Sequence, residues 1–180
     1  MARRRKLDPY SNERPEAIEL LARMMVGSSF RPPLESGSTK ISIGQADVAC
    51  AAGFMYDKLQ RETAIAVATR AGQKDLARVA AIAYRQVVKA AKHIRPEPIN
   101  LRKAENRFRL RLITFDALND LVWPERSKSY REKARAAKTR LDTYITLHRC
   151  ASAILQCALD NAVWDFEQRM FYEHENNLSE

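Results

Sequence analysis

Residues 125–173 read ERSKSYREKARAAKTRLDTYITLHRCASAILQCALDNAVWDFEQRMFYE and contain no glycine or proline, the residues that most reliably interrupt a helix. From Leu141 onward, apolar residues recur at spacings of three and four, which place them on one side of a helix. They are Leu141, Ile145, Leu155, Leu159, Ala162 and Phe166, with Leu147, Ala151, Ile154, Ala158 and Val163 beside them. The stretch therefore predicts one long helix, straight or kinked, that is largely buried from Leu141 and forms the spine of a bundle.

The amino-acid composition favours long helices with few turns. The 180 residues include only 5 Gly and 7 Pro, while 46% of them are hydrophobic and 29% are charged. This balance is typical of a globular protein with a sizeable core rather than of a disordered chain. We therefore expect an all-α protein, a helical bundle with a long C-terminal spine helix and a small N-terminal helix-turn-helix-like head.

Glycine and proline positions divide the rest of the chain. The stretch 28–40 is expected to be the longest loop and a boundary, because it contains Pro32, Pro33 and Gly37. Residues 1–40 would then hold a basic arm, a short helix and this loop, ahead of a single helical domain over 41–180. In that domain we expect the head over 41–71 and a basic helical body over 72–180.

Start and stop signals predict four helices before the spine. Their expected ranges are 16–26, 54–71, 73–94 and 101–122, with Gly72 ending the second and Asn100 capping the fourth. The apolar residues of the fourth helix also recur at helical spacing. They predict a buried stripe of Leu101, Ala104, Phe108, Leu112, Phe115 and Leu118.

The cysteines and the N-terminus indicate a reducing compartment. Cys50, Cys150 and Cys157 are an odd number in a chain without a secretory signal, which fits a cytoplasmic protein. Cys150 and Cys157 lie seven residues apart and are expected to be small buried residues. Because no stretch is apolar enough to span a bilayer, we expect no membrane partner.

Positive charge is concentrated in the middle of the chain. The formal net charge is +9, and residues 70–149 hold 20 Lys or Arg against 8 Asp or Glu. Two rows recur at helical spacing, the first with Lys103, Arg107 and Arg111, the second with Lys128, Arg131, Arg135 and Lys138. If the rows lie side by side, they form a cationic groove that would bind phosphates with salt-sensitive affinity. The alternative is a solvated face whose long stems cover apolar surface.

A short stretch before residue 60 combines small residues, one glycine and a closing leucine. In residues 45–59, QADVACAAGFMYDKL, Ala49, Gly53 and Leu59 occupy the fifth, ninth and fifteenth positions. This pattern resembles the helix-turn-helix family, in which these positions allow two helices to cross, turn the chain and pack the second helix back. Glu62 departs from the family pattern, which has an apolar residue there.

The resemblance covers about 20 residues and implies a DNA recognition helix over 55–63. Its candidate contacts to bases or phosphates are Tyr56, Lys58, Gln60 and Arg61. The alternative is a helical hairpin that turns at Gly53 for packing alone.

Little in the sequence indicates enzymatic chemistry. The three histidines are not spaced with Cys or carboxylates as metal ligands are, so we expect no metal and no cofactor. His148 continues the buried seam and is expected to be a hydrogen-bonded core residue. Asp116 and Asp120, one turn apart, are either an acid pair or, as we favour, a solvated pair at a helix end. Arg169 and His174 resemble the Arg-x4-His pair of the helical HEPN ribonucleases, which leaves ribonuclease activity as a weak alternative to a non-enzymatic role.

Together these features predict a DNA-binding regulatory protein, such as a transcriptional regulator of a bacterium or mobile element, acting on double-stranded DNA through a basic helical surface. The long C-terminal helix would also allow a homo-oligomer. The layout is similar to the small terminase subunits of phages, in which a helix-turn-helix head precedes oligomerising helices. A third reading is a non-enzymatic helical adaptor that binds an acidic protein partner.

Overall fold

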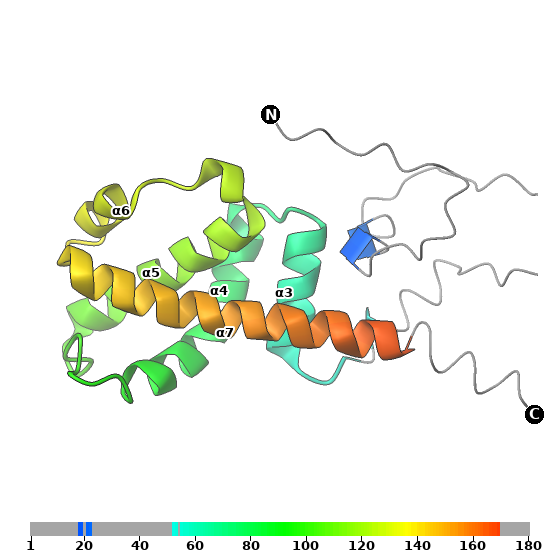
Figure 1. Cartoon of the computed structure of the whole chain (residues 1–180), viewed down its shortest axis with the longest axis horizontal. Coiled ribbons are helices and arrows are strands. Elements are labelled where there is room, and N and C mark those ends of the chain that lie inside the picture. The colour runs from blue at the N-terminus through cyan, green and yellow to red at the C-terminus, as the bar shows by residue number, and fades with distance from the viewer. Residues whose placement is uncertain (1–17, 20, 23–51, 54, 170–180) are drawn as a thin grey trace, which may run out of the picture.

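Helices make up the regular structure of the described part of the chain. The computed structural model describes residues 18–19, 21–22, 52–53 and 55–169, and Figure 1 shows how the helices are arranged. Besides the helical residues 18–19, 21–22 and 52–53, they are α3 (Lys58–Ala68), α4 (Gln73–Ala91), α5 (Ala104–Val122), the 3-10 turn η1 (Pro124–Arg126), α6 (Tyr130–Ala136) and α7 (Leu141–Glu167). No strand occurs within the described residues, so the predicted all-α class with a long C-terminal helix is confirmed.

The longest helix, α7, is the element against which the others pack. It contacts α3, α4, α5 and α6, and in Figure 1 it crosses α3, α4 and α5 while α6 lies above its N-terminal end. Its buried residues follow the predicted spacing of three and four, namely Tyr144, Leu147, His148, Ala151, Leu155, Ala158, Leu159, Ala162 and Phe166. Most of the predicted buried stripe is therefore confirmed, although four of its members are only half-buried, namely Leu141, Ile145, Ile154 and Val163.

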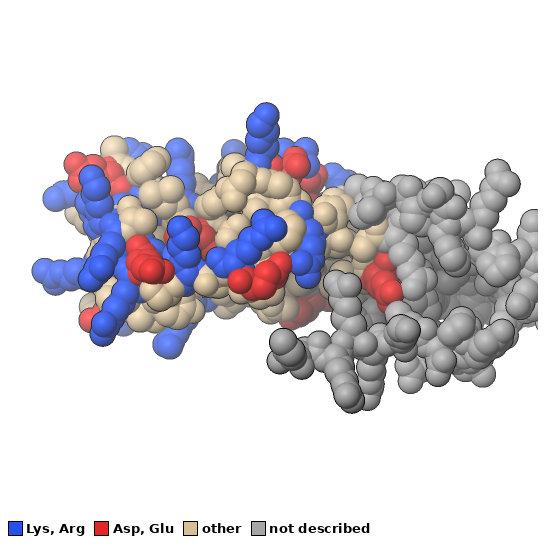
Figure 2. Space-filling view, turned by 90° about the horizontal axis from the view of Figure 1, so that it is seen from above, with Lys and Arg blue, Asp and Glu red and all other residues tan. Residues whose placement is uncertain are grey.

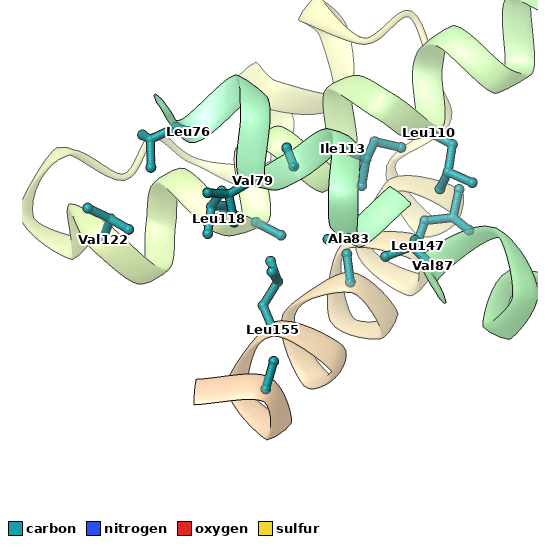
Figure 3. Close-up of a cluster of buried hydrophobic side chains, with 14 of the residues drawn as sticks. Leu76, Val79, Ala83, Val87, Leu110, Ile113, Leu118, Val122, Leu147 and Leu155 are labelled. Atoms are coloured by element: carbon teal, nitrogen blue, oxygen red, sulfur yellow. The ribbon is translucent and has the colours of Figure 1, made fainter. Parts of the chain in front are cut away.

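The main hydrophobic core lies where α4 and α5 meet α7. Figure 3 shows Leu76 of α4, Leu118 of α5 and Leu155 of α7 among the side chains of this cluster. A second, smaller cluster surrounds Leu159 and Phe166 in the C-terminal half of α7, where α3 packs. Because burying a large aliphatic side chain contributes about 1.5–3 kcal/mol, these contacts hold the helices together more strongly than local helix propensity does.

The single helix predicted from residue 125 is wrong, because the chain turns twice before α7. An extended link follows η1, and the Ser129 side chain then caps the start of α6. The end of α6 is a Schellman motif, in which the Thr139 amide donates to the Ala134 carbonyl. Lys138 adopts the left-handed conformation that this motif requires, with φ 50°. Glycine usually occupies that position, so no glycine marks this break in the sequence.

Replacing Lys138 by glycine is therefore expected to stabilise the fold. A side chain in the left-handed region costs roughly 1–2 kcal/mol, whereas glycine adopts that region freely and adds about 0.5–1 kcal/mol of unfolded-chain entropy. The net expectation is a gain of about 0.5–1 kcal/mol in the free energy of unfolding, measured by urea denaturation. Lys92→Gly, at a C-cap with φ −67°, is the control and should destabilise. A loss of stability in Lys138→Gly would contradict this account of the turn.

Other helix boundaries differ from the predicted ones by three or four residues. α3 begins at Lys58 because the Asp57 carboxylate accepts the backbone N–H of Leu59 at 2.7 Å and so caps the helix. It ends at Ala68 because Arg70, with φ 48°, occupies the left-handed position that we expected Gly72 to provide. α4 stops three residues before its predicted end, and α5 starts three residues after its predicted beginning.

The buried face predicted for α5 is also wrong. Of its six expected residues only Leu118 is buried, while Phe108 is 61% exposed and Phe115 is half-buried. The buried residues are instead Leu110, Ile113, Thr114, Ala117, Leu118 and Val122. Helix α5 has apolar residues on two faces, and the main core buries one of them, while Phe115 of the other face packs against the core only in part.

Several predictions concern residues outside the described ranges, among them the basic arm, the loop over 28–40, Ala49, Cys50 and His174. Within the described part, the predicted burial of the cysteines fails, since Cys157 is exposed and Cys150 only half-buried. Of the helices described, none is long and apolar enough to cross a membrane.

Candidate nucleic-acid interface

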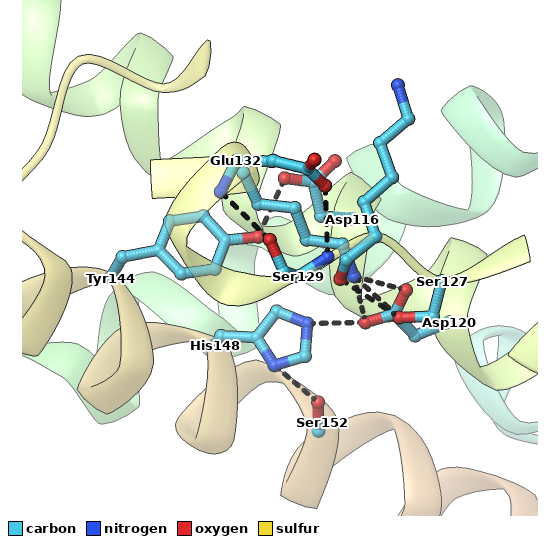
Figure 4. Close-up of polar contacts among 10 residues, drawn as sticks. Asp116, Asp120, Ser127, Ser129, Glu132, Tyr144, His148 and Ser152 are labelled. Carbon is cyan, nitrogen blue, oxygen red and sulfur yellow. Dashed lines mark hydrogen bonds and ion pairs between the residues drawn. The ribbon is translucent and has the colours of Figure 1, made fainter. Parts of the chain in front are cut away.

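Helix α6 is held against the bundle by its inner side. Ala134 and Ala137 pack into the core, and Lys133 is only 7% exposed. Its ammonium donates to the two carboxylate oxygens of Asp120, at 2.5 and 2.6 Å, and to the Ser127 hydroxyl at 2.9 Å. Figure 4 shows this group of contacts. The middle of α6 is therefore tied to the C-terminal part of α5.

His148 of α7 contacts the same carboxylate. Its Nε2 lies 3.0 Å from Asp120, its Nδ1 lies 3.3 Å from the Ser152 hydroxyl, and the residue is 3% exposed, as predicted for a hydrogen-bonded core histidine. Burial alone would raise the pKa of Asp120. Hydrogen bonds from His148, Lys133 and Ser127 outweigh burial and hold this pKa below its ordinary value. The ionised carboxylate therefore joins α5, α6 and α7 at one point.

A second carboxylate lies one turn away on α5. Asp116 accepts a hydrogen bond from the Tyr144 hydroxyl at 2.7 Å. Burial raises the pKa of Asp116 above its ordinary value, although this hydrogen bond opposes the rise. Tyr130, the first residue of α6, packs edge-on against His148 with ring centroids 5.1 Å apart. Asp116 and Asp120 are therefore not the solvated pair that we favoured from the sequence, but members of one polar cluster between helices.

The contacts from Asp120 through His148 to Ser152 follow the acid, base and nucleophile order of acyl-transfer enzymes. Ser152 lies within α7, four residues after His148, where backbone N–H groups are engaged in the helix and form no oxyanion hole. In addition, no group of three or more potential metal ligands occurs in the described part of the chain. The arrangement therefore suits the positioning of α6 better than it suits catalysis.

The outer side of α6 is a concentrated cationic surface. Arg131 and Arg135 lie one turn apart on the helix, Lys128 precedes it, Lys138 and Arg140 follow it, and all five are exposed. None of these five residues, which we call the α6 surface, forms an ion pair with another described residue. Figure 2 shows Lys and Arg gathered at the left end of the molecule, where α6 and the beginning of α7 lie in Figure 1.

The structure does not bring the end of the basic row on α5 to the α6 surface. Lys103, Arg107 and Arg111 are exposed, and the Arg111 guanidinium lies over the Tyr84 ring of α4, 5.0 Å from its centroid. α6, by contrast, contacts α5 through Asp120. That residue follows Arg111 by nine positions, which at about 100° per residue places it on the opposite side of the helix. Arg111 and the α6 surface therefore do not line one groove.

The residues of the predicted recognition helix lie at the start of α3, beside a more C-terminal part of α7 than the part that contacts α6. Tyr56 is 95% exposed, Lys58 is exposed, and Gln60 and Arg61 are half-buried. Gln60 lines a shallow pocket with Cys157 of α7, nine residues or roughly 14 Å of helix beyond the His148 contact with α6. These residues and the α6 surface form separate patches. The helix-turn-helix stays a prediction, because most of its first helix lies outside the described ranges.

Sequence reasoning identified the α6 cations but missed the contact that positions them. Lys133 lies two residues from both Arg131 and Arg135, about 200° around the helix, and therefore faces inward. The available signal was that Ala134 and Ala137 give the same side of α6 an apolar character. No family model, curated protein or solved structure matches the chain, so its function has to be argued from these contacts.

Proposed function

We propose that the protein binds double-stranded DNA through the α6 surface, as a non-enzymatic regulatory protein. The observation that supports this role is the group of five exposed cations on and beside one short helix. Glu132, the acid in α6, is engaged in the capping box with Ser129 rather than with an arginine of the surface. Because no described acid forms an ion pair with the five cations, they remain available to an anionic ligand.

A nucleic-acid duplex fits such a surface well. DNA carries one negative charge per roughly 1.7 Å of helix axis, and neutralising a phosphate releases condensed counterions. Arg131 and Arg135 are about 6 Å apart along the helix axis, which lets both reach one DNA backbone. Their planar guanidinium groups also suit two-point contacts with phosphate oxygens. Such contacts give affinity and orientation but carry no sequence information.

Sequence preference would have to come from a second element. The four candidate residues near the start of α3 are in a suitable place, since Tyr56 is 95% exposed and Lys58 opens the helix. A regulatory role would then combine base contacts from the head with phosphate contacts from the α6 surface. This part of the proposal rests on the helix-turn-helix resemblance.

Binding of a labelled duplex of about 30 base pairs is expected to weaken steeply with salt. If each of the five cations neutralises one phosphate, log K falls against log[salt] with a slope of about −4.5, or roughly 500-fold between 50 and 200 mM. Fluorescence anisotropy measures the slope, and Arg131→Ala should reduce it by about 0.9. Lys89→Ala, at an exposed site on α4, is the matched control. If Arg131→Ala leaves the slope of log K against log[salt] unchanged, the duplex binds at a surface other than the α6 surface.

A further inference from the structure

A groove runs between α4 and α5, on the side of α5 away from α6. Its volume is about 450 Å³, and it is lined by Ala77, Ala80, Ala81, Tyr84, Arg111, Leu112 and Phe115. Apart from Arg111, the lining is apolar or aromatic. The exposed alanines at 77 and 81 leave room for another backbone to approach closely.

Leu112 and Phe115, which line the α5 side of this groove, belong to the apolar stripe that we had expected to be buried, and Phe108 continues that stripe beyond the groove. Phe108, Leu112 and Phe115 are spaced by four and three residues, so they share one face of α5. Phe108 is 61% exposed, and the other two are half-buried. Single exposed apolar residues need no explanation, but a continuous apolar groove is typical of an interaction site. A groove between two helices suits the apolar face of a third helix.

The edge of the groove is cationic. Lys74, Arg85 and Lys92 are exposed along the outer side of α4, close to whole helical turns apart, and pair with no acid in the described part of the chain. Arg111 adds a guanidinium over Tyr84 inside the groove. Asp75, the acid of α4, lies six residues before Ala81, about 240° around the helix, and so does not face the groove. Glu105 of α5 does share the face of Leu112, seven residues later, and its carboxylate lies 3.8 Å from the Arg109 guanidinium.

We propose that this groove binds an acidic amphipathic helix of a partner protein. The apolar face of that helix would cover Tyr84, Leu112 and Phe115, while its carboxylates would lie against the cationic edge. Complementary charge of this kind speeds association and fixes orientation. A DNA backbone fits less well, because it would place phosphates over an apolar floor that cannot solvate them. The groove is separate from the α6 surface, so this inference does not depend on DNA binding.

The test is a titration of the full-length protein with a synthetic helical peptide of about 18 residues. The peptide carries Leu and Phe at spacings of three and four on one face and Glu on its flanks. We expect a Kd on the order of 10 μM by fluorescence anisotropy. A scrambled peptide of the same composition should bind at least tenfold more weakly, because it keeps the charge but loses the apolar face.

Two substitutions in the groove locate the peptide. Ala81→Glu adds an acid at an exposed position and should weaken peptide binding by about tenfold, and Arg111→Glu should do the same. Gln86→Glu is the matched control, because it adds the same charge at another exposed site on α4. Equal effects of Ala81→Glu and Gln86→Glu, or equal binding of the scrambled peptide, would overturn the proposal.

The same variants also test whether DNA or a second copy of the chain occupies the groove instead. If Ala81→Glu weakens the binding of duplex DNA as strongly as it weakens the binding of the peptide, the groove is a DNA-binding site. If the wild-type chain is a dimer whose solution mass halves in Ala81→Glu, the occupant is a second copy of the chain. Either result overturns the partner helix. Thermal denaturation by circular dichroism verifies that each variant is folded.

Discussion

Arg131→Glu combined with Arg135→Glu is expected to abolish measurable binding of duplex DNA. Both side chains are exposed on the outer side of α6, so the double variant removes two phosphate contacts and places two like charges against the DNA backbone. With about 1 kcal/mol for each attraction removed and each repulsion introduced, the affinity should fall roughly a thousandfold near 100 mM salt. Fluorescence anisotropy with the same labelled duplex measures the decrease.

The control for this variant changes the net charge equally at another place. Lys89→Glu with Arg95→Glu alters two exposed residues near the end of α4, outside the α6 surface. We expect the control to bind duplex within about fivefold of the wild-type protein, because only long-range attraction is weakened. Equal decreases in the two double variants would mean that binding follows total charge, and the α6 surface would lose its assigned role. The control also removes the hydrogen bonds from the Arg95 guanidinium to the Lys92 and Ile94 carbonyls, so circular dichroism has to show that both variants are folded at the temperature of the binding assay.

The spine was predictable where one helix is long and its periodicity is clean. From Tyr144 to Phe166 the buried residues repeat at three and four, and His148 falls on that seam. The break before α7 was not predictable, because Lys138 accepts a left-handed backbone that costs roughly 1–2 kcal/mol. Burial of Lys133, Ala134 and Ala137 in the folded protein outweighs that local cost. These are tertiary contacts, which local sequence patterns do not predict.

The face of α5 illustrates a different limit. Its sequence contains two apolar stripes, one through Leu110 and Ile113 and another through Phe108 and Phe115. Both satisfy the helical period, so the choice depends on which neighbours cover the helix. The main core and the contacts of Asp120 with Lys133 of α6 and His148 of α7 lie on the same side of α5. The exposed cations of the candidate site were predictable one by one, but their division into separate patches was not.

Asp120→Ala is expected to be among the most destabilising single substitutions in this chain. It leaves the Lys133 ammonium, which is 7% exposed, without its carboxylate partner, and it removes a hydrogen bond from His148. Breaking a buried pair in this way costs about 3–5 kcal/mol. Because the Asp120 side chain is 19% exposed, we expect a loss of about 2–4 kcal/mol in the free energy of unfolding. Urea denaturation followed by circular dichroism measures it.

Two comparisons test the cause of that loss. Asp142→Ala, at an exposed site in the first turn of α7, should change stability by no more than about 0.5 kcal/mol. Asp120→Leu combined with Lys133→Met removes both charges and should recover a large part of the stability. A double variant no more stable than Asp120→Ala would contradict the unpaired ammonium as the source of the loss.

The pH dependence follows from the sign of the pKa change. The pKa of Asp120 is lower in the folded than in the unfolded protein, so its stabilising contribution is complete above the unfolded value of about 3.9 and is lost as the pH falls through the folded pKa. The stability difference between wild type and Asp120→Ala should therefore be largest near pH 6 and shrink towards pH 3. Both proteins retain Asp116, whose raised pKa acts in the opposite sense and largely cancels in the difference. A constant difference would show that Asp120 acts through its shape rather than its charge.

The same carboxylate links stability to the proposed function, because it fixes α6 against the bundle. Asp120→Ala and Asp142→Ala both raise the net charge by one, which by itself favours DNA binding slightly. If the Lys133–Asp120 contact positions the α6 surface, Asp120→Ala should nevertheless bind duplex more weakly than Asp142→Ala at temperatures where both are folded. Equal affinities would mean that Arg131 and Arg135 reach DNA without this tie, and that the polar cluster serves the fold alone.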